Sequence, residues 1–228
     1  MDFDDIFTAY YRQYRAEADV PASTDDEYTI ALSLANEAVN HWRTYDNTLW
    51  KELFVNLQDS GEGVTVATST TQYDAPEDFA RGGGHVKVLD SNGKTVQTYP
   101  VIGPEDVQFK GDNDTYAFFS GNPVDNYVLN INPSPASTSS LVGKSIDYWY
   151  YKKPTEFAQG SDITEMSDPY FIVHRMLANR FRASRNPHYD DAKQDAENAL
   201  SKMKMDNESG DWSNPWTRQD RSGTAWGR

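Results

Sequence analysis

The chain has 228 residues and a formal net charge of −14 at pH 7, and this length fits one large domain or two small ones. Leu, Ile, Val and Phe make up only about 18% of it, which together with the high charge borders on the composition of unfolded chains. The chain also carries 14 Tyr, 10 Phe and 6 Trp, and each ring can bury a large apolar area. We therefore expect a folded protein with a thin core that relies on partners.

Several classes of protein are excluded by the composition. An acidic chain without clustered Lys and Arg is not suited to wrapping nucleic acid. The absence of cysteine excludes disulfides, thiol nucleophiles and Cys-ligated zinc. No apolar run approaches the roughly 20 residues of a membrane span, and the acidic start argues against a cleaved signal peptide. We expect synthesis in the cytoplasm and no membrane association.

Two helices are predicted at the start of the chain. Rings recur at steps of three and four between Phe3 and Tyr14, which places them on one side of a first helix that ends before Pro21. A capping box formed by Thr24 and Glu27 predicts the start of the second helix. An apolar stripe then predicts about seven turns, and its members are Ile30, Leu34, Ala38, Trp42, Tyr45, Leu49 and Leu53.

Between about residues 61 and 154, apolar and polar residues alternate with a period of two, which predicts short strands. His85–Leu89 and Thr95–Tyr99 flank Asn92 and Gly93, a pair that supplies the positive-φ residues of a tight hairpin. No helical segment separates the strands, so a parallel βαβ arrangement is excluded and a small antiparallel barrel or sandwich of roughly five to six strands is expected. The other predicted strands are Tyr116–Phe119, Tyr127–Asn132 and Ser145–Tyr151.

Two more helices are predicted after the strands. Asp168 with Pro169, and Asn186 with Pro187, each place a capping residue before a proline at the first helical position. The predicted fold class is therefore α+β: a helical bundle in which N- and C-terminal helices pack together, interrupted by the small antiparallel β-barrel or sandwich and followed by an extended C-terminal tail. The expected domains are residues 1–60 with 155–206 (helical), 61–154 (β) and 207–228 (tail).

Motifs for binding metals or phosphate are incomplete in this chain. The glycine-rich run Arg81–His85 lacks the Gly-Lys-Ser/Thr ending of a phosphate loop and precedes a strand, so we interpret it as a flexible turn. Asp112, Asn113 and Asp114 lack the rest of a calcium loop and are interpreted as a hairpin end. The histidines lack the spacing of a zinc protease, and they are His41, His85, His174 and His188. No catalytic, cofactor-binding or metal-binding residue is predicted.

The strand around Tyr148 to Tyr151 is unusually aromatic. Alternation would point Tyr148 and Tyr150 to the core and Trp149 and Tyr151 to an interface. Aromatic strands also stack on sugars, so a carbohydrate- or ligand-binding β module attached to a helical domain stays an alternative. A hydrolase would need a carboxylate pair at a fixed separation, which acids scattered along the chain do not identify. We do not expect an enzyme.

The last eighteen residues combine three tryptophans with three arginines and show no periodicity. Their net charge is +1, against −15 for the rest of the chain. Trp and Arg are the residue types that most often anchor interfaces, whereas an exposed indole gains nothing in water. The alternative is that these residues fold back on their own domain. We interpret them as a partner-binding segment whose anchors are Trp212, Trp216, Arg218, Arg221, Trp226 and Arg228.

The order of the segments resembles the head-to-tail connector adaptors of tailed bacteriophages that carry a β domain inserted into a helical adaptor. The resemblance covers about residues 5–206 and rests on short structural motifs in a fixed order. These motifs are Ala38–Trp42, Tyr73–Phe79, Tyr127–Pro135, Ile146–Pro154 and Asp168–Val173.

The resemblance implies a structural virion protein of the neck, made in the host cytoplasm and assembled as a ring of twelve copies. Its implied partners are the portal protein above, a downstream tail or nozzle protein below, and sister subunits, with DNA passing through the channel without sequence-specific binding. The acidic charge would then give a channel wall that repels DNA, and the C-terminal segment would bind the portal. Another phage tail or neck structural protein remains an alternative within the same class.

Overall fold

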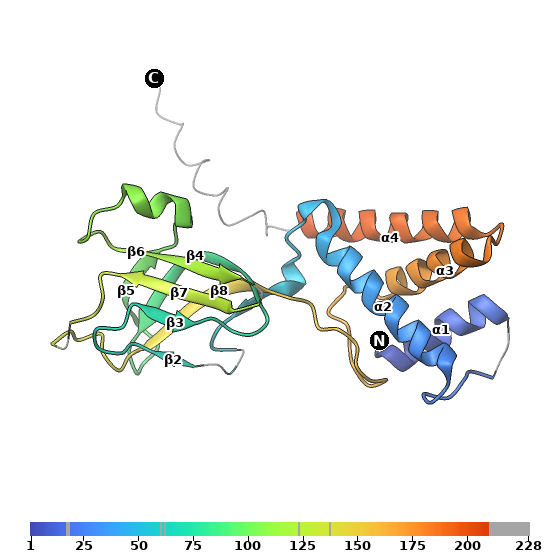
Figure 1. Cartoon of the computed structure of the whole chain (residues 1–228), viewed down its shortest axis with the longest axis horizontal. Coiled ribbons are helices and arrows are strands. Elements are labelled where there is room, and N and C mark those ends of the chain that lie inside the picture. Colours follow the sequence, from blue (N-terminus) through green and yellow to red (C-terminus); the bar gives the residue numbers. More distant parts are fainter. Residues whose placement is uncertain (17–18, 60, 62, 123, 137, 210–228) are drawn as a thin grey trace, which may run out of the picture. The chain divides into compact units, whose positions relative to one another are not determined.

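The computed structural model describes residues 1–16, 19–59, 61, 63–122, 124–136 and 138–209. The chain divides into two compact units, one made of Met1–Glu52 with the described residues from Pro154 onward, and the other of Leu53–Lys153. N- and C-terminal helices pack together in the first unit, and two antiparallel sheets form the second (Figure 1). The predicted α+β class is confirmed. The predicted C-terminal tail lies almost wholly outside the described residues.

The described part of the helical unit contains four α-helices, and two short 3₁₀ turns follow the second, the later of which runs across the boundary to the β unit. In α1, Phe3, Phe7 and Tyr10 are buried, as the three- and four-residue steps predict. The Asp2 carboxylate caps this helix by accepting the Asp5 backbone N–H at 2.9 Å. The elements are α1 (Phe3–Arg15), α2 (Asp26–Thr44), η1 (Tyr45–Asn47), η2 (Lys51–Leu53), α3 (Tyr170–Ser184) and α4 (Tyr189–Ser209).

Helix α2 is shorter than the sequence predicts. It ends at Thr44, and the next turn places Asp46 and Asn47 at φ values of 48° and 51°, a left-handed conformation that cannot continue a helix. The predicted seven turns are therefore wrong. The capping box is also wrong, because Asp25 occupies the N-cap position.

The face that α2 buries also differs from the predicted stripe. Ala31, Ala35 and Ala38 are fully buried, whereas Ile30 is 39% exposed. The predicted and the observed buried faces share Ala38 and Trp42. In the first half of the helix, the buried positions lie one residue after the predicted ones. Helix α2 packs against α3, and a buried face of alanines lets a helix approach its neighbours closely.

The helical unit is closed by hydrogen bonds between segments far apart in the sequence. The Asn36 side chain donates to the Phe157 carbonyl at 3.0 Å and accepts the Phe157 N–H at 2.8 Å. Near the last described residues, the Asn207 amide donates to the Leu49 carbonyl at 3.0 Å and accepts the Lys51 N–H at 2.9 Å. Both pairs join the chain before the β unit to the chain after it.

The β unit is a sandwich of two sheets that share one core. A five-stranded sheet has the order β1-β8-β4-β5, with β2 also paired to β8, and a three-stranded sheet has the order β3-β7-β6. All of these strand pairs are antiparallel, as predicted. Val86 and Tyr148 of the first sheet pack in the same buried cluster as Leu129 of the second.

The described part holds more strands than the predicted five or six, because β1, β2 and β3 are only two or three residues long, too short for an alternating pattern to identify each as a strand. Their bounds and those of the others are β1 (Phe54–Asn56), β2 (Val64–Thr65), β3 (Gln72–Asp74), β4 (Phe79–Leu89), β5 (Thr95–Pro100), β6 (Tyr116–Asn122), β7 (Asn126–Asn132) and β8 (Ser145–Lys152), with the 3₁₀ segment η3 (Pro104–Phe109) between β5 and β6.

The glycine-rich run is part of strand β4, so its interpretation as a flexible turn is wrong. The β4–β8 register shifts between Gly82 and Val86. A side-chain carbon on Gly82 would overlap the Phe119 ring, and one on Gly83 would overlap the Trp149 carbonyl oxygen. These glycines are needed because ring and backbone approach the strand closely.

The hairpin between β4 and β5 forms where Asn92 and Gly93 predict it. Gly93 takes a φ of 74°. The Asp90 carboxylate accepts the backbone N–H groups of Asn92 and Lys94, each at 2.9 Å, and these two bonds hold the pKa of Asp90 below its ordinary value.

We predict that Gly82→Ala destabilises the β unit, because its new methyl group must displace the Phe119 ring in a packed core. The expected loss in free energy of unfolding is about 1–3 kcal/mol, measured by urea denaturation. Gly111→Ala is the matched control, since the nearest atom to its added carbon is 3.7 Å away. Equal stability of the two variants would contradict the prediction.

We predict that Asn36→Ala lowers the free energy of unfolding by about 1–3 kcal/mol, because it leaves the Phe157 N–H and carbonyl without their side-chain partner. Ser33→Ala, an exposed position on the same helix, should change stability little. Thermal unfolding of both variants beside the wild type measures the difference.

Candidate functional site

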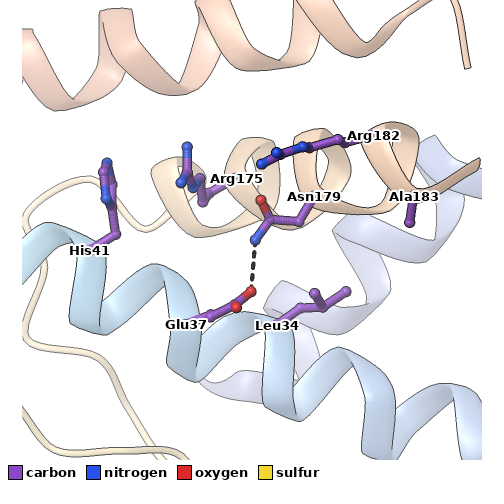
Figure 2. A pocket seen from close by; sticks show the side chains of 7 residues that line it. All are labelled: Leu34, Glu37, His41, Arg175, Asn179, Arg182 and Ala183. Atoms are coloured by element: carbon purple, nitrogen blue, oxygen red, sulfur yellow. Dashed lines mark hydrogen bonds between the residues drawn. The ribbon is translucent and has the colours of Figure 1, made fainter. Parts of the chain in front are cut away.

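An open groove of about 650 Å³ runs along α2 and α3 in the helical unit. Helix α2 contributes Leu34, Glu37 and His41, spaced three and four residues apart. The lining residues from α3 are Arg175, Asn179, Arg182 and Ala183. These spacings place each set on one face of its helix. In Figure 2, Asn179 of α3 reaches toward Glu37 of α2, while Arg175 and Arg182 lie along the side of α3 that is turned away from α2 in this view.

The α3 side of the groove is basic. Arg175 and Arg182 lie on one face with Asn179 between them, and both guanidinium groups extend toward the same side in Figure 2. Among the residues that the structure describes, no acidic group lies within 4.0 Å of either guanidinium group. Asn179 donates to the Glu37 carboxylate at 2.9 Å. The groove therefore offers two arginines without an ion-pair partner in the described chain.

His41 stands where this groove meets a second cavity of about 330 Å³ that also includes residues of α4. Its ring stacks on Phe171 at a centroid separation of 6.2 Å. Burial, followed by the positive charge of Arg175, lowers the pKa of His41, and Glu197 opposes this shift. The neutral imidazole is therefore the favoured form in the folded chain.

A second exposed feature is a group of three rings on the β unit. Phe54 of β1 stacks on Trp149 of β8, with ring centroids 5.2 Å apart, and its centroid lies 4.8 Å from that of the Tyr151 ring. Trp149 is 43% exposed, while Tyr148 and Tyr150 on the opposite face are buried. The predicted core face of this strand is confirmed. Its role as an interface stays a prediction.

A third exposed feature is η3, the segment between β5 and β6. Phe109 is 78% exposed, and the acidic residues Glu105 and Asp106 precede it on the same 3₁₀ segment. Asp106 and Phe109 are three residues apart, so they lie on one side of a 3₁₀ helix. Sequence patterning could not mark this ring as exposed, because a single Phe in a polar loop is equally compatible with burial.

The predicted partner-binding residues cannot be placed, because all six lie outside the described residues. They are Trp212, Trp216, Arg218, Arg221, Trp226 and Arg228. Shortly before the end of the described chain, Asn207 forms hydrogen bonds with Leu49 and Lys51.

No group of three or more metal-ligating side chains is found among the described residues, and within the same residues no helix is long and apolar enough to cross a membrane. Asp114 accepts the Gly111 N–H at 2.8 Å, and Asn132 donates to the Asp112 and Asp114 carbonyls at 3.0 and 2.7 Å. These bonds give the Asp112–Asp114 segment a structural role in a turn.

The sequence model of the SU10 adaptor protein family matches residues 1–219. The chain belongs to this family. SU10 adaptor proteins are phage head–tail adaptors, so the resemblance seen in the order of motifs is confirmed. No match was found among curated proteins. Membership in the SU10 adaptor family indicates a structural role in the phage.

We predict that acid destabilises this adaptor partly through His41. A folded-state pKa below the ordinary value of 6.5 means that the unfolded chain binds the proton more readily, so stability falls as the pH drops below about 6.5. His41→Gln should therefore show a smaller loss of unfolding free energy between about pH 7 and pH 5 than the wild type. An unchanged slope in urea denaturation at several pH values would contradict this.

Proposed function

We propose that this adaptor forms a ring of twelve copies that docks on the phage portal and connects it to the next tail or nozzle component. The observation that carries the proposal is the family match over residues 1–219. The division into a helical unit and a β unit supports assigning residues 1–60 with 155–206 to the adaptor domain and residues 61–154 to an inserted β domain. Such a protein acts in the neck of the virion and carries out no catalysis.

The exposed surfaces suit repeated subunit contacts. A ring is built from heterologous contacts, in which one surface of a copy meets a different surface of the next. The α2–α3 groove is polar and basic, whereas the Phe54, Trp149 and Tyr151 rings are apolar. Two chemically different surfaces on separate units supply what such contacts require.

The charge of the chain suits the proposed channel. A net charge of −14 on each copy would repel the DNA phosphates wherever the acidic residues face the lumen. DNA then passes without being held and without sequence-specific contact.

The C-terminal segment is proposed to bind the portal through Trp212, Trp216, Arg218, Arg221, Trp226 and Arg228. Its composition supports this, because tryptophan and arginine side chains dominate the binding energy of many interfaces. It follows α4, whose end is held to the chain near Leu49.

Deleting residues 211–228 tests this assignment. We expect the truncated chain to lose attachment to the portal encoded by the same phage, as seen by electron microscopy of the mixed proteins, while thermal unfolding stays nearly unchanged. A large drop in melting temperature with attachment retained would favour the segment folding back on its own unit. No complex with the full-length chain would contradict portal docking itself.

Sugar binding by the β unit is a second candidate, and the observation that favours it is the exposed Trp149 ring with Phe54 beside it. Binding of oligosaccharides that is lost in Trp149→Ala, while portal attachment persists, would support this role. Absence of binding across a broad glycan panel would remove it.

A further inference from the structure

We propose that the α2–α3 groove of one copy receives the η3 segment, Pro104–Phe109, from the β unit of a second copy. This inference names the contact between neighbours in the proposed ring and therefore rests on that function. Its two halves are exposed features of the described chain: a groove with two arginines that form no ion pair among the described residues, and a segment with an exposed ring and exposed carboxylates.

Charge complementarity identifies the occupant of the groove. Arg175 is half-buried and Arg182 is exposed, and the described residues supply neither with an ion pair. A carboxylate is the natural partner of such a guanidinium group, because the pair can form two parallel hydrogen bonds. The chain has 35 acidic and 21 basic residues, so another copy presents carboxylates in excess.

The acidic side chains around the groove do not satisfy these arginines. Glu37 accepts the Asn179 amide at 2.9 Å, and Glu197 lies 3.6 Å from the Lys193 ammonium group. His41 is favoured in its neutral form and adds no fixed positive charge. The positive charge of the groove that has no ion-pair partner in the described chain therefore comes from Arg175 and Arg182 of α3.

The η3 segment matches the groove in apolar as well as in charged groups. Phe109 is the large ring exposed at 78%, and Asp106 lies on the same side of the 3₁₀ turn. The groove includes the side chains of Leu34 and Ala183, which offer apolar contact for a ring. A ring against these two residues with a carboxylate at Arg182 makes a two-point contact that fixes orientation.

A contact of this kind also has the symmetry that a ring needs. The groove belongs to the helical unit and η3 to the β unit, so the two copies use different surfaces. Contacts of this heterologous type repeat from one copy to the next and close into a ring when the rotation permits.

A charge-swap experiment tests the contact on rings assembled with the portal and on the purified chain at high concentration. Arg182→Asp and Asp106→Arg should each weaken association between copies at least tenfold in sedimentation velocity, and the chain carrying both changes should recover most of it. Arg43→Asp and Asp112→Arg are the matched controls, since both are exposed and outside the proposed contact. Equal weakening by the controls, or failure of the double variant to recover, would overturn the inference.

Cross-linking gives an independent measurement, because the chain contains no cysteine. Ala183→Cys in one copy mixed with Gln108→Cys in another should yield a dimer with a short bis-maleimide. Ala183→Cys mixed with Asn92→Cys, which is exposed on the β4–β5 hairpin, should not. Each copy carries one thiol, so a cross-linked dimer can form only between two copies. If the groove and η3 met within one chain, no such dimer would form, and this result would overturn the inference.

The outcomes separate this inference from the proposed function. Portal attachment without the specific cross-link would contradict the groove contact alone. The specific cross-link without portal attachment would contradict portal docking alone.

Discussion

The helical unit depends on a constraint of chain closure: its two halves are separated by the whole β unit and must still pack as one body. The paired hydrogen bonds between Asn36 and Phe157, and those of Asn207 with Leu49 and Lys51, meet this constraint. Each satisfies backbone groups on the opposite segment, and each involves partners more than a hundred residues apart. Because closure fixes α2 against the returning chain, it also fixes the side chains that line the α2–α3 groove.

A chain with few aliphatic residues reaches this packing by combining very large with very small side chains. Trp42 and Trp50 lie 5.3 Å apart between ring centroids, and the Trp50 indole donates to the Trp42 carbonyl at 2.9 Å. In the β unit, Phe79 stacks on Tyr150 while Gly82 makes room for the Phe119 ring. Rings supply the buried area, and glycine or alanine supplies the space for it. Such cores tolerate little change of volume.

Large rings also explain which parts of the fold could be predicted. Aromatic residues at steps of three and four marked the buried face of α1 correctly. In α2, the apolar stripe through Ile30 did not identify the buried face, which is formed by alanines. The left-handed turn at Asp46 and the glycines inside β4 are set by tertiary contacts that no local pattern contains. The groove could not be predicted for the same reason, since His41 and Arg175 are distant in sequence and meet only through helix packing.

Charge decides how such a subunit can assemble. Each copy carries a net charge of −14, so two copies repel each other. At physiological ionic strength, salt screens this repulsion at separations beyond a Debye length of about 8–10 Å. Association then needs local contacts at which opposite charges meet, and unpaired cations are the scarce component in an acidic chain. Helix α3 contains three arginines and no acidic residue. In the described chain, only Arg180 of these three forms an ion pair, with Glu27 at 2.8 Å. In the proposed ring, Arg175 and Arg182 are therefore the places where a carboxylate of a neighbouring copy can bind despite the repulsion between two acidic chains.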